Sequence, residues 1–206
     1  MGWFEWFRRP PPIADRESLA QFIESQAAFL VQKGIYEYSR ARAGHYAKVM
    51  FGEQTFTDAF NRARWQAYPI GLAMVGELVD GVVRSTTEKA PADVLDYVRE
   101  LVLAVFDGHP VPPQIGAAAW RQEREQLDMR LRQIGLHPPK RAMDIPQALA
   151  KPYFKLMPIH EKLRGRDFET THNYLKVTMC NIHGELTDRL DVAAVSRLIP
   201  DVSRAA

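Results

Sequence analysis

The chain has a single cysteine, Cys180, among its 206 residues. One cysteine excludes an intrachain disulfide framework and a cysteine-rich zinc site, and it makes a reducing compartment the simplest expectation. The sequence also lacks the alternating apolar and polar segments that mark half-buried strands. It contains no phosphate-cradling glycine loop and no G-x-S-x-G nucleophile elbow. Nucleotide-binding α/β enzymes and α/β-hydrolases therefore have no support in this sequence.

Long hydrophobic runs are absent as well. The longest mostly apolar stretch, residues 67–83, contains Glu77 and Asp80 and is shorter than the roughly 20 residues of a membrane span. The aromatic patch at the start is shorter than the apolar core of about 7–15 residues in a signal peptide. With a formal net charge of +2, no nucleic-acid partner is expected. We expect a cytoplasmic protein, and the arginine- and alanine-rich composition suggests a bacterial one.

The apolar residues that are present recur at helical spacing nearly everywhere. We expect Gly34 to kink or end the first helix and Pro69 to kink or interrupt the third. The prediction is an all-α fold, a single helical bundle of about six helices with a proline-rich basic middle segment wrapped over it. The spacing places helices at residues 15–34, 35–50, 55–84, 91–107, 115–134 and 167–190, with a short one ending at residue 200.

Proline and charge divide this predicted chain into regions. Residues 1–13 form an N-terminal segment of aromatics, arginines and prolines, and residues 14–206 form a single helical domain. Within that domain we expect a helical core at 14–108, the proline-rich basic segment at 109–166 and the C-terminal helices at 167–200. Three consecutive prolines at the end of the first region cannot continue a helix, so they hold that region away from the helical domain.

The N-terminal region suggests a docking function. Large aromatics followed by arginines have the chemistry of a short interfacial anchor, which alone binds marginally and reversibly. Since no residue constellation identifies a reaction, we favour a non-enzymatic intracellular adaptor or assembly factor. It would dock to a protein partner or to an anionic membrane surface, peripherally at the inner face of the membrane. The alternative is that the same aromatic side chains fold back and cap the helical bundle. The residues concerned are Trp3, Phe4, Trp6, Phe7, Arg8 and Arg9.

A second hypothesis is a small-molecule-binding or enzymatic bundle. A short loop at Gly52 would make the helices on either side antiparallel neighbours, with facing residues whose numbers sum to about 105. This brings arginines and aromatic rings together, which suits an anionic ligand with a flat or apolar body. Packing of Arg40 on Trp65 inside the bundle is the competing interpretation. The candidate pocket residues are Tyr36, Arg40, Arg64, Trp65 and Tyr68.

The remaining polar patterns are better explained by a structural role than by a catalytic or metal-binding one. Glu169-x-x-His172, with His183 further along, has the spacing of one half of a di-iron site, but no second copy exists. We therefore expect no metal and no cofactor, and interpret these histidines as residues flanking a core stripe. Glu77, Asp80 and Arg84 are expected to form a solvated helix face. Glycines at 71, 76 and 81 indicate close helix packing.

Overall fold

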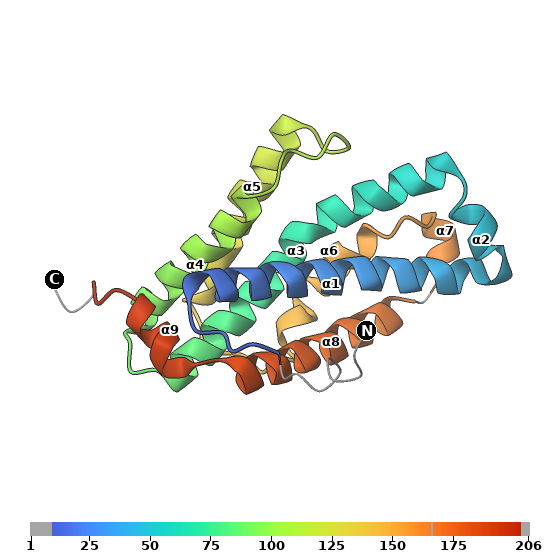
Figure 1. The fold of residues 1–206 in the computed structure, drawn as a ribbon. Helices are drawn as coiled ribbons and strands as arrows, with labels where there is room; N and C mark the ends of the chain where they lie inside the picture. Colours follow the sequence, from blue (N-terminus) through green and yellow to red (C-terminus); the bar gives the residue numbers. More distant parts are fainter. Residues whose placement is uncertain (1–9, 166, 203–206) are drawn as a thin grey trace, which may run out of the picture.

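The computed structural model describes residues 10–165 and 167–202, and in these ranges the fold is all-α, as the sequence predicts (Figure 1). Its regular structure in these ranges is helical, with one isolated bridge between Ile13 and Leu190. The long helices are α1 (Arg16–Ala43), α3 (Gln54–Thr86), α4 (Pro91–Asp107), α5 (Ala117–Ile134) and α8 (Phe168–Arg189).

Shorter helices make the connections between the long ones. One pair joins α1 to α3, a second group joins α5 to α8, and one helix follows α8. Figure 1 places α2 and α7 at one end of the molecule and α9 at the other. These elements are η2 (Gly44–Tyr46), α2 (Ala47–Met50), η3 (Ile145–Gln147), α6 (Ala150–Lys155), α7 (Glu161–Arg164) and α9 (Val192–Leu198).

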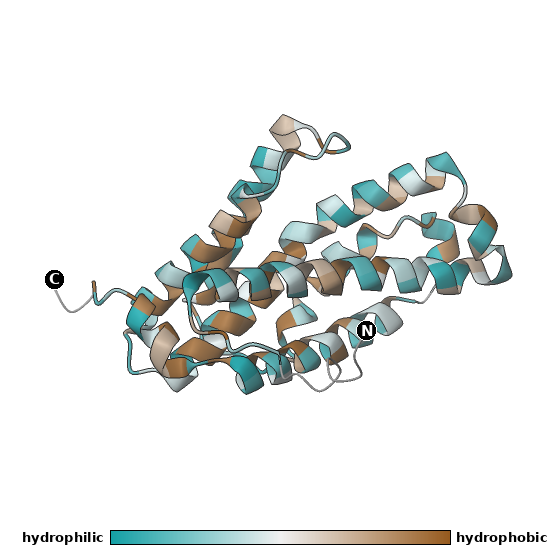
Figure 2. Cartoon of the chain, viewed as in Figure 1, coloured by the Kyte–Doolittle hydropathy of each residue, from teal (hydrophilic) through white to brown (hydrophobic). Residues whose placement is uncertain are grey.

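Helix α3 is the centre of the bundle. Every residue from Ala67 to Val83 except Glu77 is buried, because α1, α4, α5 and α8 all pack against it. Figure 2 shows the corresponding concentration of apolar ribbon where these helices meet. Of the two outcomes expected at Pro69, a kink or an interruption, the interruption does not occur, since α3 runs through that residue. Packing on all sides holds the helix together even though Pro69 has no N–H to donate to the carbonyl of Trp65.

The α3 glycines allow this close packing, as predicted. A Cβ on Gly71 would lie 3.0 Å from the backbone oxygen of Ala27, and one on Gly76 would lie 3.0 Å from Val102. Side chains larger than hydrogen at these positions would push α1 and α4 away from α3. The burial of α3 therefore depends on residues that cost helix stability locally, about 1 kcal/mol each relative to alanine.

Gly34 has a different role from the one expected, because α1 continues through it to Ala43. The residue is a site of close approach: a Cβ there would lie 2.3 Å from the hydroxyl of Tyr153 and 2.7 Å from the ring of Tyr174. Tyr153 belongs to the proline-rich middle segment, is completely buried, and donates to the carbonyl of Val31 at 3.2 Å. The middle segment thus covers the bundle and also contributes to its core.

The prediction that Glu77, Asp80 and Arg84 form a solvated face of α3 is wrong for Asp80 and Arg84. Asp80 is 0% exposed and forms an ion pair with Arg84, whose side chain is 8% exposed. Glu77 accepts from Lys140 at 2.7 Å, so the chain after α5 covers this face. Burial raises the pKa of Asp80 to about 6, although the positive charge of Arg84 opposes this shift. Helical periodicity cannot reveal such burial, because the covering residues lie more than fifty positions away.

Replacing Gly34 with alanine tests the close approach. Gly34→Ala should lower the free energy of unfolding by about 1–3 kcal/mol, because the new methyl group overlaps two tyrosine side chains. Gly184→Ala is the matched control: nothing lies within 4 Å of its added Cβ, so helix propensity alone should raise stability by up to about 1 kcal/mol. Urea unfolding followed by circular dichroism measures both. Equal stability of Gly34→Ala and wild type would contradict the packing described.

The buried ion pair leads to a separate prediction about charge. Asp80→Ala leaves Arg84 buried without a counter-charge, so it should cost about 3–5 kcal/mol of unfolding free energy. The double variant Asp80→Leu, Arg84→Met removes both charges and should be more stable than Asp80→Ala. Thermal or urea unfolding of the two variants provides the comparison. A double variant less stable than Asp80→Ala would contradict the claim that a stranded Arg84 charge causes the cost of the single variant.

Candidate ligand site

A groove follows one stripe of α1. The stripe consists of every fourth residue of the helix, a row that winds slowly around the helix because each step of four residues turns about 40° past a full turn. Three neighbouring cavities line up along it, with volumes of about 450, 50 and 470 Å³. The first two share Glu24 and His109, and the last two share Gln32 and Arg64. Over twenty residues of helix, the groove is about 30 Å long. The stripe is Arg16, Ala20, Glu24, Ala28, Gln32 and Tyr36.

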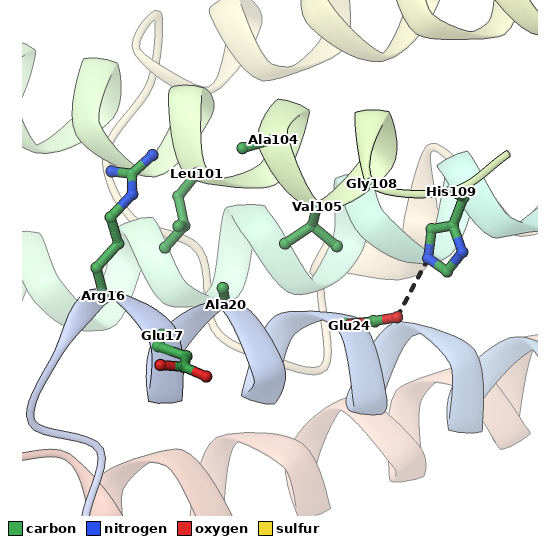
Figure 3. Close-up of a pocket in the computed structure, with 9 residues that line it drawn as sticks. All are labelled: Arg16, Glu17, Ala20, Glu24, Leu101, Ala104, Val105, Gly108 and His109. Atoms are coloured by element: carbon green, nitrogen blue, oxygen red, sulfur yellow. Dashed lines mark ion pairs between the residues drawn. The ribbon is translucent and has the colours of Figure 1, made fainter.

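The first cavity lies between α1 and α4 and is largely apolar. Figure 3 shows Leu101 and Val105 of α4 facing Ala20 of α1, with the His109–Glu24 ion pair at one end. Helix α4 ends at Asp107 and Gly108 is its C-cap, so His109 is the second residue beyond the helix, and its ring reaches back to α1. An apolar channel that terminates in a polar pair is the usual arrangement for binding an organic molecule.

The central cavity is small and bounded by aromatic rings. The Trp65 ring lies 5.6 Å from the His109 ring and 5.9 Å from Trp120 of α5, and Trp120 stacks on Phe106 of α4 at 4.2 Å. Tyr68 meets Trp65 edge-on at 6.0 Å. These contacts connect α3, α4 and α5, so the wall of the cavity is held by several elements of the fold.

The hydrogen bond between His109 and Tyr68 bears on whether the Tyr68 hydroxyl can donate to a ligand. The Nε2 atom of His109 lies 2.9 Å from the Tyr68 hydroxyl and 3.2 Å from a Glu24 carboxylate oxygen. The Tyr68 hydroxyl and Nε2 are hydrogen-bonded to each other, and the tautomer of His109 determines which of the two donates. With the hydrogen on Nε2, His109 donates to Tyr68 and the hydroxyl proton is left for another acceptor. Burial, reinforced by the charge of Glu24, raises the pKa of Tyr68 far above its ordinary value, which keeps it a donor.

Arg64 contributes the charge of the site. It lines both the central cavity and the third one, and its Nε atom is buried without a hydrogen-bond partner among the described residues. Burial lowers the pKa of Arg64 from its ordinary value. A guanidinium starts from a pKa so high that it still carries its charge at neutral pH. Arg64, which lines the central cavity, therefore has a buried Nε–H without an acceptor among the described residues, and the Tyr68 hydroxyl lines the same cavity.

The structure separates the five residues of the predicted pocket. Arg64, Trp65 and Tyr68 line the central cavity, Tyr36 lines the third cavity with Arg64, and Arg40 pairs with Glu37 at 2.9 Å on the exposed surface of α1. The proposed stacking partner of Arg40, Trp65, meets other rings instead.

The reason for this separation is register. Helix α1 ends at Ala43, eight residues before the Gly52 turn, and η2 and α2 fill the connection. Gly71 faces Ala27 and Val31, so the numbers of facing residues sum to about 100. A shift of about five residues is more than one helical turn. Tyr36 therefore lies at the level of Arg64.

Sequence reasoning missed Glu24 and His109. Glu24 looks like an ordinary surface acid of an amphipathic helix, and His109 opens the proline-rich segment after α4. Neither belongs to a local motif, because their partners lie on other elements. The one available signal is the apolar face of α4 ending next to a histidine, which places that ring near the bundle.

The three potential metal ligands of α8 are not brought together. His172 stacks on Phe168, and its Nε2 atom is buried with no hydrogen-bond partner among the described residues. His183 lies eleven residues on, about 16 Å along the helix, and lines a different cavity with Lys140 and Arg141. Glu169 is exposed. In the described part of the chain, no group of three or more His, Cys, Asp or Glu side chains is placed to hold a metal ion.

The aromatic docking residues, Trp3, Phe4, Trp6 and Phe7, and the arginines at 8 and 9 lie outside the described residues, so their function stays a prediction. The segment after them is fixed. Ile13 is fully buried and exchanges backbone hydrogen bonds with Arg189 at 2.8 Å and Asp191 at 2.9 Å. The three prolines before it are exposed.

No known protein family matches the chain, and no curated protein or solved structure matches it either. Within the residues described, no helix combines the length and apolarity that a membrane span requires. The chemistry of the α1 groove is therefore the basis for assigning a function. Its distinguishing property is a half-buried cation beside aromatic rings, at the junction of two larger cavities.

Proposed function

We propose that the protein binds a small organic anion, a carboxylate attached to a flat apolar body, in the groove along α1. The observation that carries the proposal is the buried Nε–H of Arg64, which has no acceptor among the described residues. Burying a donor without a partner costs roughly 1–3 kcal/mol, and more for a charged group. A ligand oxygen that accepts from Arg64 and Tyr68 would remove that cost.

The surroundings of Arg64 specify the rest of the ligand. A carboxylate provides several lone pairs and suits the fixed donor geometry of a guanidinium. The central cavity, about 50 Å³, holds little beyond the anionic group, whereas cavities of about 450 and 470 Å³ adjoin it on either side. Trp65 offers an indole face for an aromatic body. The α1–α4 cavity is lined mainly by apolar residues, among them Ala20, Leu101 and Val105.

Binding of 2-naphthoate, with the neutral 2-naphthamide as its comparison, tests the proposal by isothermal titration calorimetry. The carboxylate should bind more tightly than the amide. Arg64→Gln should weaken 2-naphthoate binding roughly tenfold or more, since it removes a charge-assisted hydrogen bond. Tyr68→Phe, which removes the second donor, should weaken it by about fivefold.

Arg62→Gln is the matched control, because Arg62 is an exposed arginine on the same helix. It should leave the affinity unchanged. Unfolding temperatures measured without ligand verify that each variant is folded. The proposal fails if wild type binds the acid and the amide equally, or if Arg62→Gln and Arg64→Gln have the same effect.

A further inference from the structure

The connection between α1 and α3 forms a projecting end of the molecule. It consists of η2, α2 and the turn to Glu53, at the end of the molecule away from α9 (Figure 1). Figure 2 shows apolar ribbon at α2, outside the core of the bundle. Tyr46 is 66% exposed and Val49 is 62% exposed, so two large apolar side chains point into solvent within one short segment. We call residues 44–52 the tip.

The tip is held in place by aromatic rings beneath it. Phe51 lies 5.2 Å from Tyr36, 5.0 Å from Phe56 and 5.8 Å from Phe60, measured between ring centroids. These contacts anchor α2 to both long helices. Because Phe51 takes the inward position, Tyr46 and Val49 are directed outward, and their exposure is a property of a packed segment.

Helix α7 adds a third apolar side chain at this end. Arg42 forms an ion pair with Asp167 at 3.3 Å and donates to the backbone oxygen of Leu163, which fixes α7 beside the end of α1. The side chain of Leu163 is 60% exposed. Tyr46, Val49 and Leu163 are thus exposed apolar residues contributed by two neighbouring segments.

Basic residues lie beside these apolar side chains. The tip contains Lys48 and no aspartate or glutamate, and the acidic residues that adjoin the exposed lysines in sequence are Glu53 and, in α7, Glu161. Lys48 of the tip and Lys162 of α7 are exposed, and neither forms an ion pair within the described residues. The nearby Glu37 is already paired with Arg40. Apolar side chains next to unpaired lysines have the composition of a segment that enters the interface of an anionic membrane.

We propose that the tip docks the protein on an anionic lipid bilayer, with Tyr46 and Val49 in the interfacial layer and Lys48 and Lys162 near the lipid headgroups. Exposed apolar side chains on a projecting turn, with lysines beside them, suit the interfacial layer of an anionic bilayer. The surface is small, so binding is weak, reversible and sensitive to salt. The tip is distinct from the central cavity of the α1 groove, and it lies about 40 Å from Ile13, the last residue of the N-terminal segment.

Co-sedimentation of the full chain with vesicles tests the proposal. Wild type should bind vesicles of phosphatidylserine and phosphatidylcholine and bind vesicles of phosphatidylcholine alone at least about fivefold more weakly, since each basic residue near the surface contributes about that factor. The tip variant Tyr46→Ser, Lys48→Gln, Val49→Ser should lose about tenfold or more of the binding to the anionic vesicles.

The control is Val177→Ser with Lys151→Gln, an exposed valine on α8 and an exposed lysine on α6. It should bind like wild type. Circular dichroism and the affinity for 2-naphthoate show whether each variant is folded, so loss of vesicle binding is distinguished from loss of the groove.

Three results overturn the proposal. One is the absence of wild-type binding to anionic vesicles. Another is binding that survives in the tip variant but is lost when residues 1–9 are deleted, which assigns docking to the N-terminal aromatics. The last is tip-dependent binding to polyglutamate without binding to vesicles, which would assign the tip to an acidic protein surface.

Discussion

The structure depends on burying a helix that is apolar on every side. Between Ala67 and Val83, α3 presents only Glu77 to partial solvent. A helix of this kind has no stable position at the edge of a domain, so other elements must surround it completely. Helices α1, α4, α5 and α8, together with the chain after α5, do so. Glycines at 71 and 76 set how closely the neighbours approach, and the cost of these glycines is offset by the burial they permit.

The same constraint creates the groove. Helix α1 packs against both α3 and α4, but α4 ends at Asp107. Just beyond that end His109 pairs with Glu24 of α1, and Trp65 of α3 contacts both His109 and Trp120 of α5. The candidate site is therefore located at a discontinuity in the packing around α3.

Much of the fold is predictable from the sequence, because helical periodicity is a local signal. The limits of α4 and α5, the close packing at Gly71 and the all-α class follow from residues near one another in the chain. Burial of Asp80 does not, since the covering segment around Pro139 is distant in sequence. The pocket is half predictable: Arg64, Trp65 and Tyr68 lie on one helix, but the residues facing them depend on where α1 ends. That end is decided at Gly44, with φ of +55°, before the more conspicuous turn at Gly52.

The central claim is that Arg64 and Tyr68 together hold the anionic group of an organic ligand. A crystal structure of the protein with 2-naphthoate bound tests it most directly. We expect carboxylate oxygens within about 2.7–3.2 Å of the Arg64 Nε and the Tyr68 hydroxyl, with the naphthalene ring in one of the two adjoining cavities. A carboxylate bound away from α1, or an Arg64 guanidinium paired with a protein carboxylate while the groove holds no ligand, would contradict the claim.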